Sequence, residues 1–151
     1  MKVLIITGDN TFGKSYLIWH MRQRCKMLML GQCPSSMNAW HSPQTPVDAV
    51  VLDRIGHVPN LIEIVSHAAK WCESNDTPFI VVGQPGSALE QVMSQLPEKR
   101  VVLHLVRNLE TNLIRVSIGQ QTEVLSVDSL MDKAFALVGI EISGQQLSKN
   151  L

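Results

Sequence analysis

Hydrophobic residues along the chain fall into short apolar runs and longer stretches with helical spacing. Four short runs, rich in β-branched residues, predict strands at 2–7, 49–52, 79–82 and 101–106. Between them, apolar residues that share one helical face predict helices at 14–30, 59–75 and 87–96. Strands that alternate with helices favour a parallel sheet covered on both faces, in which ligands bind at the carboxyl ends of the strands.

The pattern changes after residue 107. Segments 113–118 and 123–127 flank the tripeptide Gly119-Gln120-Gln121, which predicts a β-hairpin. Asp128 is expected to cap a last helix over 129–138.

No composition shift or linker indicates a second domain. We therefore predict an α/β fold made of one three-layer domain over residues 1–142, with a mainly parallel sheet and a C-terminal β-hairpin. The polar residues 143–151 are expected to form a flexible tail.

Composition narrows the class of protein. With 45% hydrophobic and 17% charged residues the chain reads as globular, and its 13 basic and 13 acidic side chains exclude a polybasic nucleic-acid-binding protein. The three Cys have no C-x-x-C spacing and the five His are scattered, which favours reduced thiols over disulfides or a zinc site. No apolar run approaches the roughly 20 residues of a membrane span. We expect a cytoplasmic protein without a membrane partner, in the host cytoplasm if it is viral.

Residues 8–15, hereafter the 8–15 segment, read GDNTFGKS and match G-x-x-x-x-G-K-[ST] in full, between a predicted strand and a predicted helix. Two glycines let the backbone curl so that its N–H groups point at an anion, and the following helix adds its positive end. Lys14 is expected to reach the β- and γ-phosphates, and the Ser15 hydroxyl to bind Mg²⁺. The expected nucleotide-binding residues are Gly8, Asp9, Asn10, Thr11, Phe12, Gly13, Lys14 and Ser15.

Asp53 directly follows the apolar run AVVL, which is a Walker B pattern. A carboxylate at such a strand end holds Mg²⁺ beside the phosphate loop, so Ser15 and Asp53 are the expected metal ligands. In many proteins that carry these two motifs and hydrolyse nucleotides, the next residue is a Glu that acts as the base and activates water. This chain has Arg54 there, and arginine cannot act as a base at neutral pH. Three residues could substitute as the base, although a structural role is favoured for each: His57, Glu63 and Glu110.

Gln84 ends the predicted strand 79–82 within a Gln-Pro-Gly turn. One interpretation is that its amide contacts the attacking water or the γ-phosphate. The other is that Gln84 only forms part of the turn. Arg107 and Arg115 either reach a neighbouring subunit's nucleotide as an arginine finger or are solvated. The expected catalytic residues are Lys14, Asp53, Gln84 and Arg107.

The stretches MKVLIITGDNTFGKSYL, AVVLD, FIVVGQPG and VLHLVRN together resemble the additional-strand P-loop ATPases. In that group the strand with the catalytic polar residue lies between the phosphate-loop strand and the Walker B strand. A Gln ending that strand is similar to the FtsK/HerA type, which includes viral genome-packaging ATPases and the zonular occludens toxin-like assembly proteins of filamentous phages. The resemblance covers residues 1–107 and implies ATP and Mg²⁺ as cofactors, a homo-oligomeric ring and movement of DNA.

Three functions follow from these residues. The first is an oligomeric motor-type ATPase that acts on nucleic acid, of the viral packaging or assembly kind. The second, motivated by Arg54, is a nucleotide-binding switch or accessory subunit without hydrolysis. The third is a small nucleoside or nucleotide kinase, because the pair Asp53-Arg54 loosely resembles a D-R acceptor motif, although no Arg-rich lid is present. The chain has no N-K-x-D motif for guanine, which favours adenine.

Overall fold

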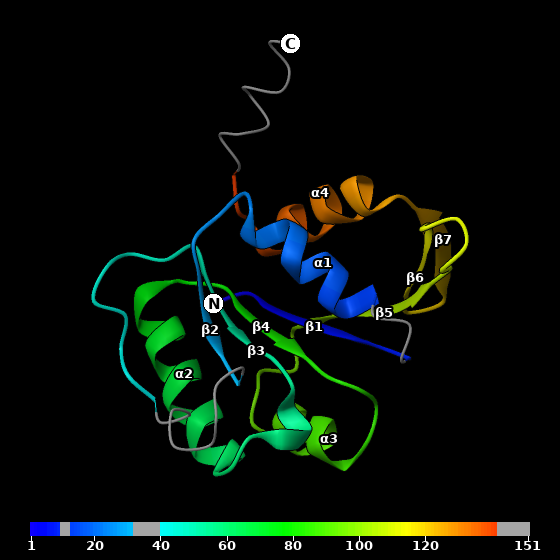
Figure 1. Ribbon diagram of the computed structural model, residues 1–151. Coiled ribbons are helices and arrows are strands. Elements are labelled where there is room, and N and C mark those ends of the chain that lie inside the picture. Colours follow the sequence, from blue (N-terminus) through cyan, green and yellow to red (C-terminus); the bar gives the residue numbers. More distant parts are fainter. Residues whose placement is uncertain (10–12, 32–39, 142–151) are drawn as a thin grey trace.

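The computed structural model describes residues 1–9, 13–31 and 40–141, except for the side chain of His57. Over these residues the chain folds into an α/β arrangement of four α-helices and seven strands (Figure 1). In chain order the elements are β1 (Val3–Gly8), α1 (Gly13–Arg22), β2 (Met27–Leu30), β3 (Ala49–Leu52), the 3₁₀ helix η2 (Ile55–His57), α2 (Leu61–Asn75), β4 (Phe79–Val82), α3 (Ser87–Ser94), β5 (Val101–Arg107), β6 (Ile114–Ile118), β7 (Gln121–Leu125) and α4 (Val127–Val138).

The strands form one sheet in the order β2-β3-β4-β1-β5-β6-β7. The first five strands in this order run parallel, β6 is antiparallel to β5, and β7 is antiparallel to β6 across Gly119 and Gln120. The expected α/β fold with a mainly parallel sheet is therefore confirmed, and the strands predicted at 49–52 and 79–82 have those bounds in the structure.

Helices cover both faces of the sheet, with α1 and α4 on one side and α2 and α3 on the other (Figure 1). On the first side, Leu17 of α1 and Phe135 of α4 pack in one apolar cluster with Leu105 of β5. On the second side, Val65 of α2 packs in another cluster with Val81 of β4. Strands β1, β3 and β4 are buried along their whole length, because both of their faces are covered.

The helix predicted over 14–30 is wrong in its second half. The helix α1 ends at Arg22, and Met27–Leu30 forms the edge strand β2. This strand pairs in parallel with β3, and the Asp48 carboxylate accepts a hydrogen bond from the Lys26 backbone N–H at 2.8 Å just before the pairing starts. Met and Leu are good helix formers, but tertiary context overrides helix propensity, and here the pairing with β3 makes these residues extended.

The predicted cap of the last helix is also wrong. Ser126, not Asp128, is the N-cap of α4, and its Oγ accepts a hydrogen bond from the Ser129 N–H at 3.2 Å. A serine hydroxyl at this position satisfies one of the unpaired N–H groups of the first turn. Val127, expected to end a strand, starts the helix instead. The tail predicted at 143–151 lies outside the described residues.

Candidate functional site

Three strands that end near candidate site residues have their carboxyl ends at the same edge of the sheet. β1, which leads into the 8–15 segment, pairs in parallel with β4, and β4 pairs in parallel with β3. Gln84 follows β4 and Asp53 follows β3, so both lie at the same carboxyl edge as Gly8. The strand that ends near Gln84 therefore lies between the other two, which is the order that the resemblance to additional-strand ATPases implies.

Both glycines of the 8–15 segment lie against β5. Gly8 has a φ of 152°, and a Cβ at this position would overlap with the carbonyl oxygen of Leu105. A Cβ at Gly13 would lie 3.3 Å from the Cβ of Arg107. Gly8 thus needs glycine for both packing and backbone freedom, whereas Gly13 leaves only tight space for a side chain. Asn10, Thr11 and Phe12 lie outside the described residues, and their phosphate-binding roles stay predictions.

Lys14 lies in the first turn of α1 and turns back toward the end of β1. Its Nζ donates to the carbonyl oxygens of Gly8 at 3.3 Å and of Asp9 at 2.6 Å. Burial lowers the pKa of Lys14 below its usual value of 10.5, while the negative charges of Asp9 and Asp53 act in the opposite direction. The ammonium group therefore lies within electrostatic reach of the Asp53 carboxylate.

Asp53 is held in place from three sides. Its side chain is 7% exposed, and its Oδ1 accepts a hydrogen bond from the Arg54 N–H at 2.8 Å. Its own N–H donates to the Leu30 carbonyl oxygen at 2.9 Å, which continues the pairing of β2 with β3. Gly31 follows at the end of β2, and any Cβ there would overlap with the Asp53 carbonyl oxygen. The backbone of Asp53 is thus fixed by β2, and its carboxylate is oriented by the Arg54 N–H.

The residues present fit a nucleotide-bound magnesium ion. The Ser15 hydroxyl, exposed in the first turn of α1, and the Asp53 carboxylate offer the hard oxygen ligands that Mg²⁺ prefers. Among the residues that the structure describes, no cluster of three or more His, Cys, Asp or Glu could hold a metal ion. A magnesium ion here would therefore take its other ligands from phosphate oxygens and water.

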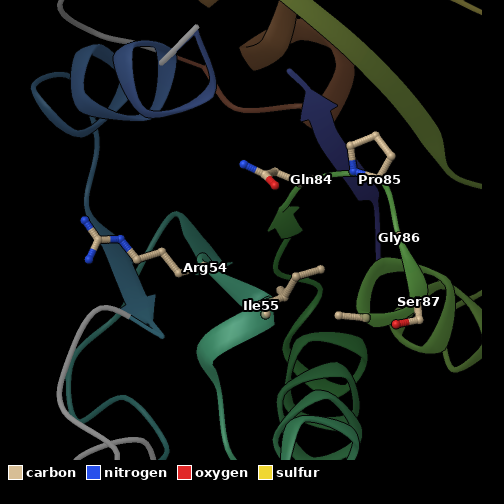
Figure 2. A pocket seen from close by; sticks show the side chains of 8 residues that line it. Arg54, Ile55, Gln84, Pro85, Gly86 and Ser87 are labelled. Carbon is tan, nitrogen blue, oxygen red and sulfur yellow. The ribbon is translucent and has the colours of Figure 1, made fainter. Parts of the chain in front are cut away.

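A cavity of about 480 Å³ opens at the same edge of the sheet, between the ends of β3 and β4 (Figure 2). Gln84 extends from the end of β4 and Arg54 from the end of β3, and the chain turns at Pro85 and Gly86 into α3. The cavity is lined by Arg54, Ile55, Gly56, Gln84, Pro85, Gly86, Ser87 and Ala88. None of these side chains is acidic, so the lining contains no carboxylate that could act as a general base.

Neither acidic residue considered as a substitute base lines this cavity. Glu63 is exposed in the first turn of α2, where its Oε1 lies 3.9 Å from His67 Nε2. Glu110 lies in the connection between β5 and β6, and its N–H donates to Asn108 Oδ1 at 2.9 Å. The side chain of His57 lies outside the described part of the structure.

Arg107 and Arg115 lie on opposite faces of the sheet. Arg107 ends β5, and its guanidinium Cζ lies 3.9 Å from the ring centroid of Tyr16. Arg115 is exposed on β6 between the buried Ile114 and Val116, whose side chains point to the α1 face. Only Arg107 therefore lies near the 8–15 segment of its own chain. Sequence reasoning missed Tyr16, although an aromatic residue directly after the G-K-S triplet was visible.

No protein-family model matches the chain, and comparison with curated proteins finds no significant match. Within the described ranges, no helix is long and apolar enough to cross a membrane.

Proposed function

We propose that the chain is a P-loop NTPase of the additional-strand group that binds ATP and Mg²⁺ at the 8–15 segment. The observation that supports this most is the position of Lys14, at the start of α1 and within electrostatic reach of the buried Asp53. The strand order adds support, because the strand leading to Gln84 separates the strands leading to these two residues.

Each residue of the site has a role in this proposal. Lys14 contacts the β- and γ-phosphates, for which it would exchange its hydrogen bonds to the backbone carbonyls of Gly8 and Asp9. Ser15 and Asp53 hold Mg²⁺, which neutralises charge on the β- and γ-phosphates. The Gln84 amide, at the cavity, contacts the γ-phosphate or the water next to it.

The broader part of the proposal is a homo-oligomeric motor that acts on nucleic acid, as in viral packaging or assembly ATPases. It is based on the resemblance and on the strand order. The chain has 13 basic and 13 acidic residues, so it lacks the excess of positive charge that binds DNA non-specifically. Contact with DNA is expected from a local patch or from several copies of the chain.

A second candidate function is a nucleotide-binding switch that does not hydrolyse ATP. The observation that favours it is the cavity between the ends of β3 and β4, whose lining includes Arg54 and, among the described residues, no carboxylate. Arginine stays protonated at neutral pH and cannot take a proton from water. In this case the protein would hold ATP and release it unchanged.

Nucleotide binding is tested by measuring the affinity for Mg²⁺-ATP of the parent and of a Lys14→Ala variant by calorimetry. A hydrogen bond to a charged group is worth about 1.5–3 kcal/mol, so the variant should bind roughly 10- to 150-fold more weakly. Lys70→Ala, which removes an exposed lysine of α2, is the matched control and should bind as the parent does. Equal affinity of the parent and Lys14→Ala would refute the proposal.

Turnover then separates the two candidate functions. Release of phosphate that increases with added DNA supports the motor, whereas tight binding without phosphate release supports the switch. Transfer of phosphate to an added nucleoside, without release into water, would instead favour a kinase.

A further inference from the structure

The Arg107 side chain contacts Tyr16 and Asn112 of its own chain. Its guanidinium Cζ lies 3.9 Å above the centre of the Tyr16 ring, and its Nη2 donates to Asn112 Oδ1 at 2.7 Å. A guanidinium prefers such a position over an aromatic face, where it interacts with the ring electrons. The hydrogen bond to the amide fixes the rotation of the planar group. Together the two contacts determine where the positive charge lies.

This charge lies beside the start of α1. Leu103 and Leu105 of β5 are buried in the apolar cluster that contains α1, and side chains two residues apart share a face. Arg107 therefore projects to the α1 face at the carboxyl end of β5. Its Cβ would contact a Cβ at Gly13, and its partner Tyr16 belongs to the first turn of the helix.

The strand order gives the direction of a bound triphosphate, if the proposed function is correct. Asp53 and Gln84 lie at the ends of β3 and β4, on one side of β1, and mark the γ-phosphate end. β5 pairs with the other side of β1. A phosphate chain with its γ-phosphate near Asp53 and its β-phosphate near Lys14 must leave toward β5, where Arg107 lies.

We infer that Arg107 contacts the α-phosphate of the nucleotide bound to its own subunit, and that Tyr16 and Asn112 are positioning residues for its guanidinium. Guanidinium groups match the geometry of phosphate oxygens, and stacking on Tyr16 uses the face of the group rather than its N–H edge. This inference rests on the proposed function. It assigns to Arg107 a role inside its own subunit, in place of the two alternatives that the sequence left open, an arginine finger or a solvated side chain.

The test compares the affinities for Mg²⁺-ATP and Mg²⁺-ADP, because both nucleotides carry an α-phosphate. Arg107→Ala should weaken the binding of both by the same factor, at least about tenfold for a charge-assisted contact. Tyr16→Ala should weaken both by a smaller equal factor, and Tyr16→Phe, which keeps the ring, should bind as the parent does. The double variant should be no weaker than Arg107→Ala alone, because Tyr16 acts only through the guanidinium.

Asn112 offers a second variant with little risk to folding. It has a φ of 61°, so Asn112→Gly removes the amide while tolerating this backbone conformation. Asn112→Gly should reduce the affinities for Mg²⁺-ATP and Mg²⁺-ADP by the same factor. Arg107→Lys keeps the charge but loses the planar fork, and its affinities should lie between those of the parent and of Arg107→Ala. If circular dichroism shows that Arg107→Ala does not fold, Asn112→Gly and Arg107→Lys replace it in the test.

The outcomes separate this inference from the proposed function. Loss of binding in Lys14→Ala with unchanged binding in Arg107→Ala overturns only the inference and leaves Arg107 as either an arginine finger or a solvated side chain. Weaker ATP binding with unchanged ADP binding in Arg107→Ala also overturns it, because the contact would then be with the γ-phosphate. Additive losses from Tyr16→Ala and Arg107→Ala would overturn the positioning role of Tyr16.

Discussion

Gly8 and Leu105 are register partners in the paired strands β1 and β5, and the carbonyl oxygen of Leu105 occupies the space that a side chain at Gly8 would need. The first glycine of the 8–15 segment is therefore required by the neighbouring strand before any ligand is considered. Its φ of 152° adds a second requirement, since residues with a Cβ rarely adopt that conformation.

Gly8→Ala should destabilise the protein by about 2 kcal/mol or more, because the new methyl group overlaps with backbone and the φ becomes strained. Chemical denaturation of the parent and the variant measures the difference in free energy of unfolding. Gly56→Ala is the matched control. No atom lies within 4 Å of a Cβ at that position, and its φ lies outside the range that residues with a Cβ rarely adopt. Equal stability of Gly8→Ala and the control would contradict the packing described for β1 and β5.

Arg54→Glu should increase ATP turnover above that of the parent. The variant places a carboxylate in the lining of the cavity at the ends of β3 and β4, where the parent has none. Steady-state phosphate release under saturating Mg²⁺-ATP measures the effect. Arg54→Gln, which removes the positive charge without adding a base, should not gain turnover. A gain of the same size in both variants would mean that the charge of Arg54, and not the missing base, limits hydrolysis.

Lys14→Met should change how stability depends on pH. The pKa of Lys14 is lowered by burial, so its charged form is disfavoured in the folded protein relative to the unfolded chain. This penalty is present at neutral pH and is lost as the pH rises through the lowered pKa toward 10.5. The stability of the parent relative to Lys14→Met should therefore rise with pH, as followed by denaturant unfolding. Lys70→Met, at an exposed position, is the matched control variant.

Burial raises the pKa of the Cys72 thiol from 9.0 to about 12, and the residue is fully buried between α2 and the sheet. The native thiol should therefore resist iodoacetamide at about pH 8, since only thiolate reacts. Its raised pKa stabilises the fold below pH 9.0, and this contribution is lost as the pH rises through about 12. Peptide-resolved mass spectrometry should detect alkylated Cys72 only with denaturant. Rapid labelling of the folded protein would contradict the burial.

Local sequence patterns predicted the buried strands because these consist of apolar runs with clear ends. The run FIVV stops at Gly83, and AVVL stops at Asp53, and both strands have the predicted bounds. The strand β2 was not predictable in this way. Its residues Met27–Leu30 continue a helical spacing of apolar residues, and only pairing with β3 makes them extended. Long-range pairing of this kind has no signature in a short window of sequence.

The motif and the apolar runs predict the candidate site residues, and the resemblance implies the order of three strands, but the contacts between side chains were not predictable. The glycines, Lys14 and Ser15 follow from the motif, and Asp53 from its position after an apolar run. That the strand leading to Gln84 lies beside β1 depends on the order of strands in the sheet. The contact of Arg107 with Tyr16 joins residues 91 positions apart in sequence (107 minus 16), and it arises only when β5 pairs with β1.

The three strands that are apolar on both faces have an alignment problem that amphipathic strands avoid. A slip by one residue would exchange side chains between the two apolar clusters without exposing a polar face, so hydrophobicity alone does not select the correct alignment. Close fits at the carboxyl edge can select it, because a Cβ at Gly8 or Gly31 would overlap with the backbone of Leu105 or Asp53. A Cβ at Gly83 would meet only the Ile55 side chain, which can move. Enlarging Gly8 or Gly31 should then disturb the alignment of the strands and shift candidate site residues that the substitution does not touch.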